Sequence, residues 1–279
     1  MTNSRRARAG IILAVAGVIA VGGAGVALLG AMVDETHFAR PTADFDALRE
    51  ETDAVDGVTV LQSERWVEAP TFSHPSSWMS VETTPAALPA LLETVCDNTY
   101  DEPVSWAVEV VSSSGTRVSL FSDAALGCAR FGLNAVGAVA KIDAVAPGVQ
   151  VQAAVADSRT LTLFSFAYDG LDAVAPLVAG AEAIRAAALL PADMPVEVAG
   201  SQLGVTVRPG EGAAYNALLT RLIDDFDVTY FSFGGGGTPV DGVEKLQVIA
   251  PQENHAAIAS LIEESALPVA ALPVMFLES

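Results

Sequence analysis

The chain has 279 residues, of which 51% are hydrophobic and 17% charged, enough to build a substantial buried core. Its formal net charge is −20 at pH 7, with 34 Asp and Glu against 14 Lys and Arg. A chain this acidic repels phosphate groups, which argues against nucleic acid as a partner and against adsorption to an anionic membrane surface.

Residues 10–32 form an uninterrupted apolar run without charge, Asn, Gln or Pro. As a helix this run reaches about 34 Å, enough to cross a hydrocarbon core of about 30 Å. Basic residues beginning at Arg5 precede the run, and Asp34 and Glu35 follow it. We therefore predict a cytoplasmic tail at 1–9 and a single-pass transmembrane helix, with the C-terminal region extracellular and the protein in the cell membrane.

A cleaved secretory signal peptide is the alternative interpretation of the same run. Signal-peptide cores usually span about 7–15 residues and end in a small-x-small cleavage site. This run is longer, and its end offers no clean site of that kind. The pattern therefore favours an uncleaved anchor.

After a spacer at 33–42, strand and helix patterns alternate along the rest of the chain. Period-2 alternation and short runs of β-branched residues indicate the strands, whereas apolar residues at helical spacing and Thr or Pro near a first turn indicate the helices. The predicted helices are 44–55, 85–95, 122–142, 171–190, 212–226 and 251–265. The predicted strands are 58–61, 77–83, 104–110, 118–120, 149–155, 160–168, 196–199, 203–207, 228–233, 243–250 and 269–277.

These elements repeat as strand, strand, helix, with hairpin turns about 40 residues apart. A hairpin pairs antiparallel, and the helix that follows it covers one face of the sheet. The predicted fold class is therefore α+β: a transmembrane helix followed by ββα units that form antiparallel sheets in ferredoxin-like, split βαβ lobes. The first lobe is predicted at 43–122, and further units at 123–279. A single curved open sheet is the alternative.

The stretches Val104–Phe121 and Val149–Tyr168, each with its following helix, resemble the BON-type domains of bacterial envelope proteins. The resemblance is one of pattern and covers roughly residues 44–276. It implies attachment to the cell envelope, through lipid or peptidoglycan, without catalysis.

The two cysteines, Cys96 and Cys128, fall on the predicted extracellular side. An even pair in an oxidising compartment indicates a disulfide, and two buried thiols are the alternative. Their spacing fits no zinc site. The histidines stand apart from one another and from any HExxH pattern, so we predict no metal, no cofactor and no catalytic residues.

Three features are candidates for partner contacts. The glycine run at 234–237, with Gly235 and Gly236 at its centre, lacks the Lys of a phosphate-binding loop and is predicted as a hairpin tip. Trp66 and Trp78 border a Pro- and Ser-rich loop and are candidates for an exposed patch, whereas Trp106 alternates with valines and is predicted in the core.

Together these features predict a non-catalytic, membrane-anchored binding or scaffold protein of the bacterial cell envelope. Its partner would be a protein or the cell wall, and the pattern leaves the oligomeric state open. The alternative is an extracytoplasmic hydrolase or metal-dependent enzyme, which would need a deep pocket that gathers carboxylates, His or Ser from distant parts of the chain.

Overall fold

The computed structural model describes residues 37–68, 74–156, 159–165, 170–233 and 243–278. The strands are β1 (His37–Ala39), β2 (Val58–Glu68), β3 (Ser76–Thr83), β4 (Val104–Val111), β5 (Arg117–Ala125), β6 (Gln150–Ala156), β7 (Thr160–Ser165), β8 (Val196–Gly200), β9 (Leu203–Val207), β10 (Tyr230–Ser232), β11 (Leu246–Ile249) and β12 (Val274–Phe276). The helices are α2 (Ala43–Asp53), α3 (Leu88–Asp97), α4 (Ala135–Val145), α5 (Leu171–Ala187), α6 (Gly212–Phe226) and α7 (His255–Glu263), with short 3₁₀ turns η1 (Gln252–Asn254) and η2 (Pro268–Ala271).

The strands form one mixed sheet in the order of the chain, from β1 to β12. Each hairpin pairs antiparallel, as in β4–β5, and each helix from α3 onward then crosses to a parallel strand, as from β5 to β6. Helix α2 instead connects the antiparallel strands β1 and β2. A crossover helix carries the chain back to the end of the sheet where the preceding strand began, so the next strand runs parallel to that strand. The sheet is therefore mixed and not purely antiparallel. The fold is α+β, but the predicted antiparallel sheets in ferredoxin-like lobes are wrong, and the open sheet is the arrangement found.

The strands β3 to β9 direct their buried apolar side chains to the same face of the sheet. The strand registers align these side chains in a row that crosses from β3 to β9, and every member of the row is buried. The row consists of Val81, Val108, Leu120, Ala153, Leu163, Val198 and Val205.

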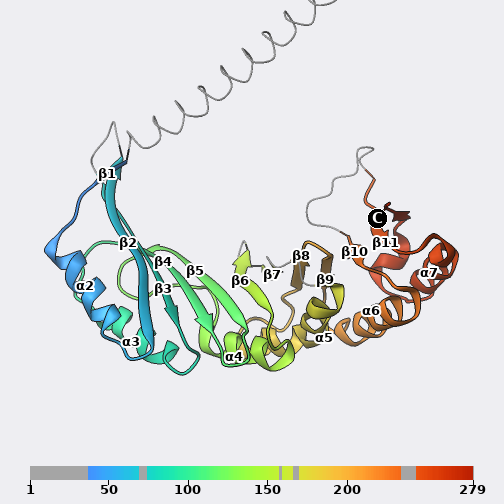
Figure 1. Cartoon of the computed structure of the whole chain (residues 1–279), viewed down its shortest axis with the longest axis horizontal. Helices are drawn as coiled ribbons and strands as arrows, with labels where there is room; N and C mark the ends of the chain where they lie inside the picture. Colours follow the sequence, from blue (N-terminus) through green and yellow to red (C-terminus); the bar gives the residue numbers. More distant parts are fainter. Residues whose placement is uncertain (1–36, 69–73, 157–158, 166–169, 234–242, 279) are drawn as a thin grey trace, which may run out of the picture.

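The helices cover this apolar face and form the outer, convex side of a curved molecule (Figure 1). Neighbouring helices α4 and α5 contact each other closely, as do α5 and α6. At Gly180 in α5 an added Cβ would lie 2.9 Å from the Val145 side chain of α4, so only glycine permits this approach. The core is therefore one continuous layer between sheet and helices.

The helical crossovers do not all have the same hand. The connections β5–α4–β6 and β7–α5–β8 advance in the same direction across the sheet, but β5 and β7 run in opposite directions. Because α4 and α5 contact each other, they lie on the same face. Two such connections must have opposite hand, so one of them is left-handed, a rare kind of connection in proteins.

The predicted helix at 122–142 is wrong in its first half. Residues as far as Ala125 belong to β5, and α4 begins only after Asn134, whose side chain accepts a hydrogen bond from the Gly137 N–H. Ser122 is buried in the strand, where its hydroxyl accepts a hydrogen bond from the backbone N–H of Arg130. The loop is fixed by this contact and by a disulfide, neither of which follows from helical spacing.

The predicted transmembrane architecture also needs correction. No helix in the described part of the chain is both long and apolar enough to cross a membrane. The longest, α5, has 17 residues and contains Pro176 and Arg185, and at 1.5 Å per residue it reaches only about 26 Å. The predicted span at 10–32 lies outside the described residues. The structure therefore does not support a transmembrane helix, a single-pass topology or the cell-membrane localisation.

The predicted disulfide between Cys96 and Cys128 is confirmed. It joins the last turn of α3 to the loop between β5 and α4, and so links two successive ββα units. The structure places both cysteines at exposed positions rather than in the core.

Replacing both Cys96 and Cys128 with Ser should lower the free energy of unfolding by roughly 3–4 kcal/mol, because the unfolded chain regains the freedom of a loop closed over a separation of 32 residues. Urea denaturation followed by circular dichroism measures the change. Dithiothreitol should destabilise the parent protein by a similar amount and leave the double variant unaffected. Equal stability of parent and variant in oxidising buffer would contradict the prediction.

Leu163 and Phe164 are consecutive residues of β7 that test the orientation of the sheet, since Leu163 is fully buried and Phe164 is 39% exposed. Leu163→Ala should cost about 2–5 kcal/mol of unfolding free energy, because it leaves a cavity beneath the helices. Phe164→Ala should cost less than about 1 kcal/mol. A larger loss for Phe164→Ala than for Leu163→Ala would mean that the faces are assigned the wrong way round.

Candidate functional site: the open face of the sheet

The first candidate surface is the face of the sheet that points away from the helices, and we call it the open face. It forms the concave side of the molecule (Figure 1). Its side chains alternate along each strand with the buried ones and lie in rows of their own. One row crosses from β3 to β12 and consists of Glu82, Glu109, Ser119, Gln152, Phe164, Ala199, Gly204, Ser232, Gln247 and Met275.

Aromatic side chains interrupt this mostly small and polar surface. Phe121 on β5 is 50% exposed and lies opposite Ala107 of β4. Trp78 on β3 lies between Glu64 of β2 and Ser105 of β4, and it is half-buried. Exposed aromatic rings among small polar side chains offer flat apolar contacts, which are common at the centres of binding sites.

An ion cluster occupies the open face where β3, β4 and β5 adjoin. Glu82 and Glu109 lie directly opposite each other in the register of β3 and β4. The Arg117 Nη1 atom lies 2.6 Å from Glu109 Oε1 and 3.5 Å from Glu82 Oε2. The hydrogen bond to Glu109 raises the pKa of the Arg117 guanidinium above its ordinary value. The cluster therefore holds one positive and two negative charges at a solvent-accessible position.

The structure brings two of the predicted contact residues onto this face and leaves two undescribed. Trp66 and Trp78 both point to the open face, since they pair with Ser76 and Glu64, which share that side. Gly235 and Gly236 lie outside the described residues. Phe121 and Phe164 were not predicted as contact residues. Both occupy the polar positions of alternating strands, and this is the signal that could have identified them.

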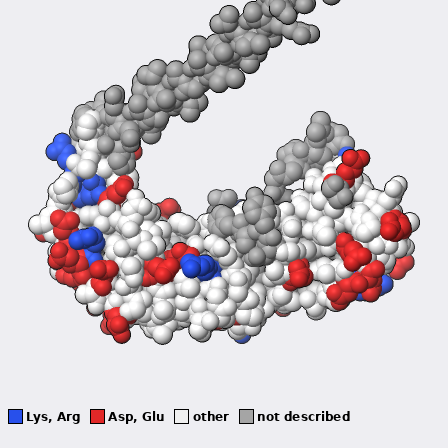
Figure 2. All heavy atoms as spheres, in the orientation of Figure 1, with Lys and Arg blue, Asp and Glu red and all other residues white. Residues whose placement is uncertain are grey.

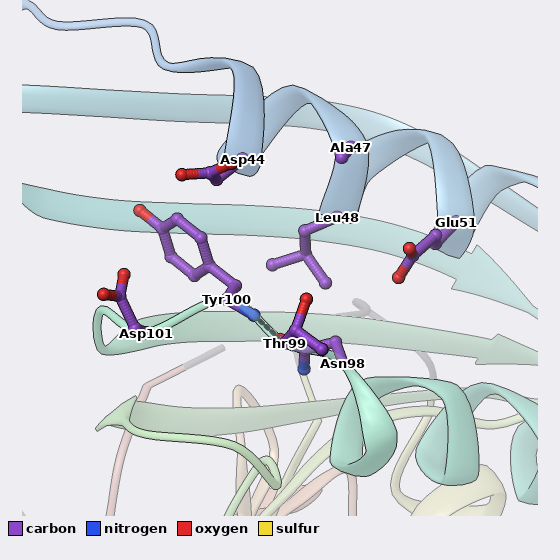
Figure 3. Close-up of a pocket in the computed structure, with 8 residues that line it drawn as sticks. All are labelled: Asp44, Ala47, Leu48, Glu51, Asn98, Thr99, Tyr100 and Asp101. Atoms are coloured by element: carbon purple, nitrogen blue, oxygen red, sulfur yellow. Dashed lines mark hydrogen bonds between the residues drawn. The ribbon is translucent and has the colours of Figure 1, made fainter.

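A second candidate is a cavity of about 230 Å³ between α2 and the loop after α3 (Figure 3). Its lining includes three carboxylates, those of Asp44, Glu51 and Asp101. The Tyr100 ring lies across one side of it, near Asp44 and Asp101 (Figure 3). The eight lining residues also include Thr99, and none of them is His, Ser, Cys or Lys.

The hydroxyl of Tyr100 belongs to a structural network beside this cavity. Arg65 donates from Nε and Nη2 to the two oxygens of Glu102, at 2.7 and 2.6 Å, and the Tyr100 hydroxyl donates to Glu102 Oε2 at 2.8 Å. The Ser77 hydroxyl lies 2.8 Å from that of Tyr100. Arg65 lowers the pKa of the Glu102 carboxyl, and burial raises the pKa of the Tyr100 phenol. The network ties β2, β3 and the loop before β4 together.

A wider hollow near the C-terminal edge of the sheet has His255 and Phe276 in its wall. The two rings stack with centroids 3.8 Å apart, and His255 Nε2 lies 3.1 Å from the carbonyl oxygen of Ala250. These contacts fix the imidazole as a packing group between α7 and β12. No group of three or more His, Cys, Asp or Glu that could hold a metal occurs among the residues that the structure describes.

No protein-family model, no curated protein and no solved structure matches this chain. The resemblance to BON-type domains therefore stays a prediction. The candidate site rests on the geometry of the open face alone.

Replacing Glu102 with Gln should lower the unfolding free energy by about 2–3 kcal/mol at pH 7, because it removes a charged partner that holds Arg65 in two hydrogen bonds. Because the folded state lowers the pKa of Glu102, the carboxylate stabilises the protein above its ordinary pKa of 4.5. That contribution is lost as pH falls through the lowered folded-state value.

Denaturation of Glu102→Gln and the parent protein from pH 7 down to pH 3 measures this difference. The two should converge at the acidic end. Glu93→Gln, at an exposed position of α3, is the matched control and should change stability by less than about 0.5 kcal/mol. A Glu102→Gln deficit that stays constant across the whole range would contradict the assigned role.

Proposed function

We propose that this protein is a non-catalytic binding protein that holds an extended macromolecular partner across the open face of its curved sheet. The observation that carries the proposal is the one-sided cover of the sheet. In the described part of the chain the helices lie on the apolar face, so the concave face carries no helical layer there (Figure 1). Repeat proteins of stacked units use extended concave surfaces of this kind for binding.

The chemistry of the open face supports the same function. Ser, Thr and Gln side chains supply hydrogen-bond donors and acceptors at regular strand spacing, and Phe121 and Phe164 add exposed apolar contacts. A face with no binding role would be expected to carry polar side chains without large exposed rings. The aromatic residues on this face are therefore the residues expected to contribute most to binding.

The double variant Phe121→Ala and Phe164→Ala tests the proposal. Labelled parent protein is applied to an array of printed peptides and an array of polysaccharides, and the retained signal is measured for each spot. We expect the double variant to lose at least about tenfold of the signal on the spots that the parent protein binds, which corresponds to the loss of central aromatic contacts.

Leu189→Ala is the matched control, since Leu189 is 77% exposed and follows α5 on the helical side of the molecule. It should retain the parent signal on every spot. Equal binding by the double variant and the parent, or equal loss in the Leu189→Ala control, would refute the assignment of binding to the open face.

A further inference from the structure

We propose that two copies of this chain associate through β12, which pairs antiparallel with its own copy about a two-fold axis at Met275 and joins the two sheets into one. The inference goes beyond the proposed binding function and concerns a different part of the molecule, the C-terminal edge of the sheet at the red end of Figure 1. It is carried by the pairing of β12, by the direction of its backbone groups and by its apolar side chains.

Strand β12 is paired on one side only in the described part of the chain. It lies parallel to β11, and the sheet order places no described strand on its other side, which we call the outer edge. The strands that follow α3, α4, α5 and α6 each have a parallel neighbour on one side and an antiparallel neighbour on the other. The outer edge of β12 therefore corresponds to the place of an antiparallel strand in the repeating pattern of this sheet.

The backbone of β12 directs hydrogen-bonding groups to the outer edge. The Pro273 carbonyl oxygen accepts a hydrogen bond from β11 at 3.0 Å, and the Leu277 N–H donates one to β11 at 2.9 Å. Because backbone groups alternate along a strand, Met275 between these two residues also points to β11. The N–H and C=O groups of Val274 and Phe276 then point away from β11, where an added strand can bond to them.

A second copy of β12 fits these groups in a self-complementary way. When Met275 of one copy lies opposite Met275 of the other, Val274 of each copy lies opposite Phe276 of the other. Each such pair exchanges both of its backbone hydrogen bonds, as opposite residues do in an antiparallel ladder. Because the same strand is used on both sides, the contact closes at a dimer and does not propagate into a filament.

The side chains of β12 match under the same symmetry. Val274 and Phe276 lie in register with two fully buried residues of β11, and so occupy the helix-covered face, but they are themselves only half-buried. In the dimer each Val274 lies beside the Phe276 ring of the other copy, and cross-strand pairs of aromatic and β-branched side chains stabilise a sheet. Pairing therefore extends the apolar core of one copy into that of the other.

The distribution of charge also favours this edge as the place of contact. Acidic side chains outnumber basic ones on the side of the molecule drawn in Figure 2, so two copies repel each other over much of their surface. Residues 272–277, by contrast, contain no charged side chain, although edge strands that remain single commonly carry one. The copies therefore meet where their repulsion is weakest.

Sedimentation velocity of the full chain between about 1 and 200 µM tests the proposal. We expect a reversible equilibrium between monomer and dimer with a dissociation constant of about 1–100 µM, since the contact is small. The equilibrium should shift toward the dimer as NaCl rises from about 50 to 300 mM, because salt screens the repulsion between two acidic copies.

Substitutions at Met275 test the two-fold register, because this residue lies opposite itself in the proposed dimer. Met275→Glu and Met275→Lys each place like charges across the axis, so either variant alone should dimerise at least tenfold more weakly than the parent protein. An equimolar mixture of the two variants brings opposite charges together. The mixture should associate at least tenfold more tightly than either variant does alone.

Gln247 provides the matched control, since it lies beside Met275 in the register of β11 and β12 and is also half-buried. Gln247→Glu and Gln247→Lys introduce the same charges one strand further from the axis. Each should weaken dimerisation less than about threefold, because charges separated by more than about a Debye length are largely screened. Circular dichroism checks that all four variants are folded.

A parent protein that stays monomeric up to about 200 µM would overturn the inference, since even a weak interface of this kind is populated there. Association that the Met275 variants leave unchanged, or a mixture no tighter than its components, would show contact through another part of the chain and would equally overturn it. Growth beyond the dimer at high concentration would indicate head-to-tail pairing of the two sheet edges and would refute the two-fold arrangement.

Discussion

One constraint governs this structure: the strands β3 to β9 bury one side each, and all of them direct that side to the same face. Leu120, Ala153 and Leu163, from three consecutive strands, are opposite one another and fully covered. Helices that connect strands must therefore all pack on that face. If every crossover were right-handed, successive helices would alternate between the two faces, because successive crossover strands run in opposite directions. Burial of the apolar face thus overrides the usual preference for right-handed crossover connections.

The same constraint explains why a broad surface stays accessible. A sheet with helices on both sides needs strands that are apolar throughout, as in parallel α/β folds. Here residues such as Ser119 and Gln152 alternate with the buried ones, and a second helical layer would bury their polar groups without partners. The open face is therefore a consequence of how the core is built. What is specific to it is the addition of large aromatic rings such as that of Phe121.

Much of the local structure could be predicted from the sequence, because it depends on neighbouring residues. Helix α6 has the predicted bounds, and the pairs of strands on either side of the predicted hairpin turns do pair antiparallel. The association of the hairpins with one another could not be predicted from the strand pattern. Two separate lobes and one continuous sheet would bury the same alternating apolar residues, so the pattern does not distinguish these two folds. The start of α4 was missed because Ser122 and Cys128 make contacts with residues distant along the chain.

The candidate site shows the same division between local pattern and tertiary arrangement. Composition around a loop drew attention to Trp66 and Trp78, but their common side follows only from the pairing of β2 with β3. Glu82 and Glu109 are 27 residues apart and carry no local signal, yet the parallel pairing of β3 and β4 places them opposite each other. Arg117 of β5 contacts both carboxylates, so this ion cluster exists only because three strands pair in this register.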